Sequence, residues 1–217
     1  MTRKALLVGA SGLVGRALLE RLLAEPSYGE VHALLRRPIA GWPQHPKLHT
    51  QQVDFAALPK LPRLDEVFIA LGTTIKQAGS QAAFREVDFD AVLASARAAR
   101  AAGAKALFMV SALGADPKST VFYNRVKGEA EQAVQGLGFE QVVLARPSLL
   151  LGDRAALGQP GRAGEGTATR LLRPLSGLIP RSVRPIEATA VAQALVAAAQ
   201  QRQPGLRILN SAEMQPR

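Results

Sequence analysis

Short apolar runs recur along the first two thirds of the chain, and segments with helical spacing separate them. A strand that carries such a run buries both of its faces, so the pattern predicts a parallel sheet with helices on both sides. Parallel strands need right-handed crossovers, and this order of elements therefore winds into a doubly wound α/β sheet. The expected strands are residues 5–8, 31–35, 48–53, 67–71, 106–110 and 142–145.

Four helices are expected around these strands. The first begins directly after a glycine-rich turn, keeps its apolar residues at helical spacing and ends before Pro26. The second has its apolar residues on one stripe and ends at Gly103. The predicted ranges are 13–24, 81–102, 121–137 and 187–201.

The last third of the chain differs in composition. Ten glycines and prolines lie between Gly152 and Pro185, and they predict loops and short helices there. We therefore expect a single domain over residues 1–217, in which residues 148–217 form a small substrate cap and the closing elements. A short apolar stretch at 206–209 is one of those closing elements.

Composition limits the classes of function. The net charge of +10 would suit nucleic acid, but no basic run exceeds two residues and only 5% of residues are aromatic, so nucleic acid is not the expected partner. With no cysteine and three histidines, metal-free chemistry is favoured and no metal site is expected. No apolar run is long enough for a membrane span, and the N-terminus begins with a strand pattern, which predicts a cytoplasmic protein.

A glycine-rich motif, Gly-x-x-Gly-x-x-Gly, follows the first strand and begins the first helix. Its first glycine permits a tight turn, its second lets backbone N–H groups approach a pyrophosphate, and its third lets helix and strand pack closely. The helix N-terminus adds partial positive charge. This position predicts a Rossmann dinucleotide site, and its cofactor contacts are Gly9, Ser11, Gly12, Leu13, Val14 and Gly15.

The end of the second strand indicates which dinucleotide is bound. NAD-binding folds carry an Asp or Glu there, about 20 residues after the glycines, to bind the ribose hydroxyls. This chain has Arg36 and Arg37 instead, and two guanidiniums can bind a 2′-phosphate that a carboxylate would repel. We therefore predict NADP(H) as the cofactor. The alternative is that both arginines are ordinary surface charge ahead of Pro38.

Two further loops follow strands at the edge of the sheet where ligands bind. Asp54 and Phe55 follow the third strand, and Asp54 either accepts a hydrogen bond from the adenine amino group or caps the next turn. Leu71, Gly72 and Thr73 follow the fourth strand, where a glycine lets the backbone approach the cofactor ribose.

A candidate catalytic group consists of Ser111, Tyr123 and Lys127. The tyrosine and the lysine stand four residues apart on one predicted helix, so they share a face, and the serine ends the fifth strand. A free tyrosine ionises near pH 10, so a tyrosine base at neutral pH needs a neighbouring cation such as the lysine. The serine would hydrogen-bond the oxygen that reacts. The alternative places Tyr123 in the core and Lys127 on a solvated face.

Taken together, these motifs resemble an atypical short-chain dehydrogenase/reductase, and more narrowly the Tat-interacting-protein type of NADP-binding oxidoreductase. The resemblance implies acid–base and orienting roles for the three catalytic candidates, and it places Pro147 and Ser148 near the nicotinamide. Many relatives carry an asparagine on the helix before the serine strand. This chain has Asp88 and Asp90 there instead. The resemblance also extends to residues 114–116, 126–129 and 152–154.

Three functions follow from this resemblance. The first is an NADP(H)-dependent oxidoreductase that transfers hydride to or from a small carbonyl or alcohol, acting as a monomer or homodimer. The second is a regulatory protein that senses NADP(H) and changes its contact with a protein partner. The third is a nucleotide-sugar epimerase, for which the expected cap is small.

Overall fold

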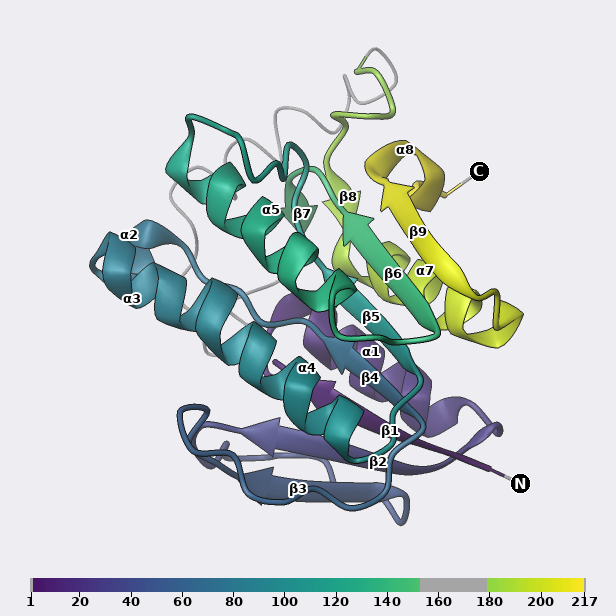
Figure 1. Ribbon diagram of the computed structural model, residues 1–217. Coiled ribbons are helices and arrows are strands. Elements are labelled where there is room, and N and C mark those ends of the chain that lie inside the picture. Colours follow the sequence, from purple (N-terminus) through teal and green to yellow (C-terminus); the bar gives the residue numbers. More distant parts are fainter. Residues whose placement is uncertain (1, 153–178, 217) are drawn as a thin grey trace.

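The computed structural model describes residues 2–152 and 179–216, and a seven-stranded parallel sheet forms its centre (Figure 1). The strand order is β3-β2-β1-β4-β5-β6-β9, and this confirms the predicted doubly wound fold. A separate two-stranded parallel sheet joins β7, Leu150–Leu151, to β8, Ile186–Glu187. The main strands are β1 (Arg3–Val8), β2 (Tyr28–Leu35), β3 (Leu48–Gln52), β4 (Glu66–Ile69), β5 (Ala106–Val110), β6 (Gln141–Arg146) and β9 (Gly205–Asn210).

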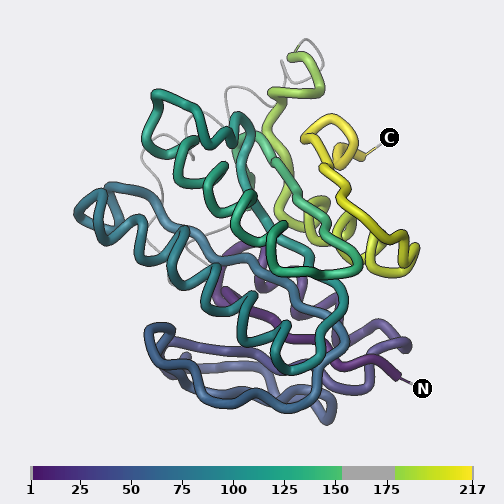
Figure 2. The backbone as a smooth tube through the Cα atoms, in the orientation of Figure 1, coloured from purple at the N-terminus to yellow at the C-terminus, as the bar shows by residue number. Residues whose placement is uncertain are grey.

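The direction of winding reverses at β1. The chain runs outward from β1 to β2 and β3, then returns to place β4 on the other side of β1 (Figure 2). A crevice opens at such a reversal because the connections leave to opposite sides, and ligands of open α/β sheets bind there. The carboxyl ends of β1 and β4 therefore mark the expected site.

Helices cover both faces of the sheet (Figure 1). One face packs against α1 (Leu13–Ala24) and α7 (Ala188–Gln201), with a buried cluster that includes Leu7, Phe68 and Phe108. The opposite cluster includes Leu6, Val67 and Leu107, the adjacent residues on the same strands, because successive strand residues point to opposite faces. The helical elements over this second face are α3 (Gln81–Arg85), η1 (Glu86–Asp90), α4 (Ala91–Ala101) and α5 (Phe122–Gln135). Short helices α2 (Ile75–Ala78) and α8 (Ser211–Met214) complete the described elements.

The end of the chain contributes to the core. β9 pairs with β6 along the edge of the main sheet, and Ala192, Leu195 and Ala199 of α7 are fully buried. The closing elements predicted from the sequence thus extend the sheet and its helical layer. The loops and short helices predicted for 152–185 fall mostly on residues 153–178, outside the described part of the chain.

Among the described residues, no helix has both the length and the apolar character needed to span a membrane. Within the same part of the chain, His, Asp and Glu side chains form no group of three or more with a metal-binding arrangement.

Candidate functional site

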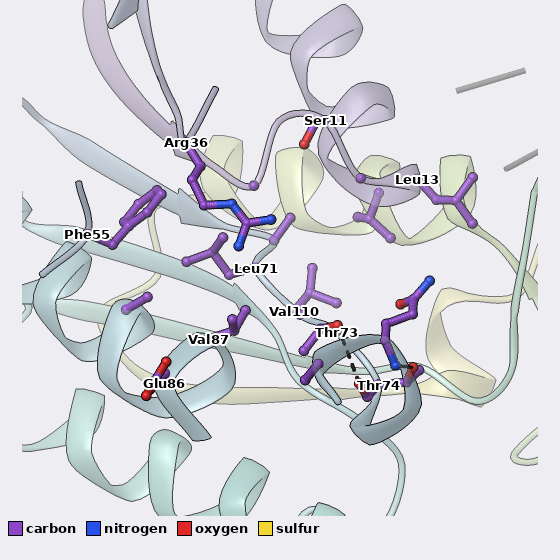
Figure 3. Close-up of a pocket in the computed structure, with 18 of the residues that line it drawn as sticks. Ser11, Leu13, Arg36, Phe55, Leu71, Thr73, Thr74, Glu86, Val87 and Val110 are labelled. Carbon is purple, nitrogen blue, oxygen red and sulfur yellow. Dashed lines mark hydrogen bonds between the residues drawn. The ribbon is translucent and has the colours of Figure 1, made fainter. Parts of the chain in front are cut away.

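A cleft lies along the carboxyl ends of the central strands, with the glycine-rich turn on one side and η1 on the other (Figure 3). Its volume between the described residues is about 2070 Å³. Of the residues selected from the sequence, Gly15 alone does not line this cleft, because it lies beneath the turn where α1 packs on β1. The others that line it are Gly9, Ser11, Gly12, Leu13, Val14, Arg36, Arg37, Asp54, Phe55, Leu71, Gly72, Thr73, Ser111, Tyr123, Lys127, Pro147 and Ser148.

The three glycines of the turn serve different needs. Gly9 has a positive φ of 84°, and a Cβ there would lie 2.5 Å from the backbone of Ala70. A Cβ on Gly15 would lie 1.9 Å from the carbonyl oxygen of Gly9. Gly12 has no such clash, since its nearest neighbour would be 3.4 Å away. The fold therefore requires the first and third glycines, whereas the middle one leaves space open in the cleft.

That open space lies at the N-terminus of α1. Gly12 is the N-cap residue, it supplies no side-chain hydrogen bond, and no acidic residue lies in the first turn. Uncapped first-turn N–H groups and the helix dipole favour an anion at this position. The geometry thus fits the phosphates of a dinucleotide.

Three guanidiniums border the cleft near the second strand. Arg36 and Arg37 are exposed, and neither forms an ion pair with any described residue. Arg36 projects into the cleft between Ser11 and Leu71 (Figure 3). Arg16 of α1 also lines the cleft, with its guanidinium 4.7 Å from the ring centroid of Trp42. Arg16 was not predicted, because its position on a helix does not show in the sequence that it would reach Trp42 and the cleft.

The loop after β3 shows one of the two roles considered for Asp54. Its Oδ1 accepts a hydrogen bond of 2.9 Å from the backbone N–H of Ala56, which is the turn-capping role. Asp54 and Phe55 also line the cleft, so the contact with adenine stays a prediction.

The three catalytic candidates all line this cleft. Ser111 is 5% exposed, and its Oγ has no hydrogen-bond partner among the described residues. Tyr123 lies in the first turn of α5, and its ring centroid is 5.4 Å from that of Phe84. Lys127 is 5% exposed, so it does not lie on a solvated face. A buried hydroxyl without a partner beside a cleft is the arrangement expected of a group that binds a ligand.

The charge of Lys127 is set by its surroundings. Its Nζ lies 2.7 Å from Oδ1 of Asp88, which is fully buried. Burial lowers the pKa of Lys127, but the charges of Asp88 and Tyr123 raise it by more, so it stays above its ordinary value. The amine is therefore an ammonium at neutral pH, as a group that stabilises a phenolate must be.

Two contacts hold α5 in place. A Cβ on Gly128 would lie 2.2 Å from the backbone of Asp116 and Pro117, so the helix packs directly on that loop. On its buried side, Glu131 accepts hydrogen bonds from Nε and Nη2 of Arg146, the first at 3.0 Å. These contacts set where Tyr123 and Lys127 stand.

We expect Gly128→Ala to lower the free energy of unfolding by about 2 kcal/mol, because the added methyl group overlaps backbone that cannot move cheaply. Gly136→Ala is the matched control, since its Cβ would lie 3.6 Å from the nearest atom, the carbonyl oxygen of Ala133, at the end of the same helix. Urea unfolding of both variants measures the difference. Equal stability of the two variants would contradict the close packing.

The last two predicted residues, Pro147 and Ser148, directly follow β6. The carbonyl of Pro147 accepts a 2.9 Å hydrogen bond from the backbone N–H of Leu113, in the loop after β5. The Ser148 hydroxyl donates to the carbonyl of Arg184 and accepts from Ser211 Oγ at 3.0 Å. Ser148 lines the cleft, but its hydroxyl is used in linking the segment after β6 to Arg184 and to α8.

Comparison with known proteins gives the family. The model of the NAD(P)H-binding family matches residues 9–202. Protein HTATIP2 of Rattus norvegicus is 35% identical over 173 residues, covering 77% of this chain and 69% of its own. The mitochondrial protein fmp52 of Emericella nidulans is 38% identical over 156 residues, covering 68% and 67%.

Solved structures confirm the fold. A short-chain dehydrogenase/reductase family oxidoreductase from Burkholderia thailandensis has a TM-score of 0.68 at 18% identity, covering 98% of this chain and 93% of its own. MoeE5 in complex with UDP-glucose and NAD has a TM-score of 0.72 at 20% identity, covering 95% and 75%.

The relatives also correct one prediction. Several fungal relatives are named mitochondrial, which contradicts the cytoplasmic location predicted from the N-terminal sequence. That prediction was wrong because receptors read cellular addresses from signals that the packing of a domain does not reveal. The resemblance inferred from the motifs, in contrast, is confirmed by the family match over residues 9–202 and by the relatives. The chain belongs to the NAD(P)H-binding family, and within it to the Tat-interacting-protein type that HTATIP2 represents.

Proposed function

We propose that this protein is an NADP(H)-dependent oxidoreductase that acts on a small carbonyl or alcohol. The observation that carries the proposal is the buried Ser111 hydroxyl, which has no hydrogen-bond partner within residues 2–152 and 179–216 and lines the same cleft as Tyr123 and the charged Lys127. A buried hydroxyl without a partner costs about 1–3 kcal/mol, and a hydrogen bond to a bound substrate oxygen would offset that cost. The cleft volume also exceeds the ~300–1,000 Å³ of common ligand pockets, as a dinucleotide together with a substrate requires.

Each residue has a role in this reaction. The glycine-rich turn and α1 bind the phosphates of the cofactor, which supplies or accepts the hydride when bound. Ser111 donates a hydrogen bond to the substrate oxygen and orients it. In the reductive direction, Tyr123 gives its phenolic proton to that oxygen. The ammonium of Lys127 then stabilises the phenolate that remains.

The preference for NADP(H) over NAD(H) rests on Arg36 and Arg37. Both guanidiniums border the cleft without a carboxylate partner in the described structure, so they are available to a 2′-phosphate.

We expect Arg36→Ala and Arg37→Ala each to weaken NADPH binding by about 10-fold and to leave NADH binding unchanged, since only NADPH carries the extra phosphate. Calorimetric titration of each variant with both cofactors measures this. Arg207→Ala, an exposed arginine on β9, is the control. Equal losses for both cofactors, or no loss for either, would count against the proposed specificity.

A screen of small aldehydes and ketones with NADPH, and of small alcohols with NADP+, tests the activity itself through the change in nicotinamide absorbance. Turnover that requires Ser111 supports the proposal. Tight NADPH binding without turnover across the screen would favour the regulatory alternative, in which the bound cofactor alters contact with a protein partner. In a parallel incubation with sugar nucleotides, release of a changed sugar nucleotide without net cofactor oxidation would favour the epimerase.

A further inference from the structure

The helical run over residues 81–101 contains one π-helical turn, η1, at Glu86–Asp90. The apolar spacing predicts a continuous helix over residues 81–102. A π turn fits an extra residue into the helix at a cost in hydrogen-bond geometry, and such turns are frequent at functional sites. Asp88, in the middle of η1, is fully buried. The turn thus places a carboxylate on the inner side of the helix.

The carboxylate of Asp88 joins three elements. Its Oδ2 accepts a 2.9 Å hydrogen bond from the backbone N–H of Thr73, in the loop after β4. Its Oδ1 lies 2.7 Å from Nζ of Lys127 on α5. A Cβ on Gly72 would lie 3.5 Å from both of these charged atoms, so the loop backbone closes directly over the pair. Asp88 therefore connects the cofactor side of the cleft to the catalytic lysine.

The charges around Lys127 make Asp88 its principal counter-ion. From α5, Tyr123 and Glu131 also act on the amine, but Glu131 is bound by Arg146 of β6. The other acidic residues of η1, Glu86 and Asp90, are exposed. A buried ammonium without a counter-ion pays a desolvation cost that drives it toward the neutral amine.

We propose that Asp88 is a positioning residue that holds the Lys127 ammonium beside Tyr123 and compensates its charge where both charged side chains are buried. The catalytic consequence rests on the proposed function, because it requires that Tyr123 exchange a proton with substrate. The protonation state of Lys127 does not depend on the proposed function, and it can be measured without any substrate.

The test follows the ¹³Cε signals of labelled lysines by NMR as a function of pH. Lys127→Met identifies the Lys127 signal by its loss. In the wild type we expect Lys127 to keep its proton to a higher pH than the exposed lysines. In Asp88→Asn we expect the titration midpoint of Lys127 to fall by about one pH unit or more. Asp90→Asn, an equal change of charge at an exposed position of the same turn, should leave the midpoint unchanged.

An unchanged Lys127 midpoint in folded Asp88→Asn would overturn the proposal. If that variant does not fold, the wild type still decides, because a midpoint below that of the exposed lysines would show that Asp88 does not compensate the charge. Once a substrate is known, Asp88→Asn should also lose turnover at a lower pH than the wild type. A uniform loss of turnover without a change in its pH dependence would instead mark Asp88 as purely structural and contradict the proposal. If the screen finds no turnover, the NMR result stands alone.

Discussion

Tyr123→Phe is expected to lower turnover by about 1000-fold and to leave the affinity for NADPH unchanged. The phenolic oxygen is the proposed proton donor, whereas the ring, packed 5.4 Å from that of Phe84, is kept in the variant. The position of α5 should therefore not change. Steady-state kinetics on a substrate from the screen, together with calorimetric titration of NADPH, separates the two effects.

The chain supplies a matched control. It has only two tyrosines, and the other, Tyr28, is fully buried and donates a 2.6 Å hydrogen bond to Glu66. Tyr28 does not line the cleft, so Tyr28→Phe should lower stability and leave turnover unchanged. Turnover that survived in Tyr123→Phe would contradict the proposed proton transfer, whatever the effect on cofactor binding.

Gly12→Ala is expected to weaken NADPH binding by about 100-fold while the fold persists. The methyl group has room within the protein, since its nearest neighbour would lie 3.4 Å away, but it occupies the open side of the turn where a phosphate would approach. Loss of one or two charge-assisted hydrogen bonds, at about 1.5–3 kcal/mol each, accounts for that factor. Calorimetric titration and thermal unfolding of the same samples measure affinity and stability.

Gly15→Ala is the comparison variant that separates an effect on ligand binding from an effect on folding. Its methyl group would lie 1.9 Å from the carbonyl oxygen of Gly9, so the strand-to-helix turn cannot keep its shape. We expect this variant to be strongly destabilised. If Gly12→Ala lost stability to the same degree, or kept full affinity for NADPH, the middle glycine would not be the point of approach for the pyrophosphate.

Much of the fold follows from local pattern. α1 begins and ends where the glycine turn and Pro26 predict, and β5 has the predicted limits. β2 starts three residues before the predicted strand, at Tyr28, because that ring is buried beside Phe68 and its hydroxyl binds Glu66. These partners lie on β4, far away in sequence, and no local run of apolar residues shows them.

The site also has features that the local sequence predicts and features that only tertiary contacts explain. The phosphate turn has a signature of residue types at fixed spacing, and its glycines stand in the cleft or directly beneath it. The π turn at η1 has no such signature, because the periodicity of 81–102 is that of an ordinary helix. Its reason is tertiary: the contact of Asp88 with Lys127, across 39 positions of the chain. The hydroxyl of Ser148 likewise binds Arg184 and Ser211, which only the folded chain brings near.

Calorimetric titration of the wild-type protein with NADPH and with NADH tests the central claim most directly. The account predicts saturable binding of one NADPH per chain, with affinity at least about 10-fold above that for NADH, as loss of one charge-assisted phosphate contact implies. Absence of binding heat with both cofactors, with the protein shown to be folded, would contradict it.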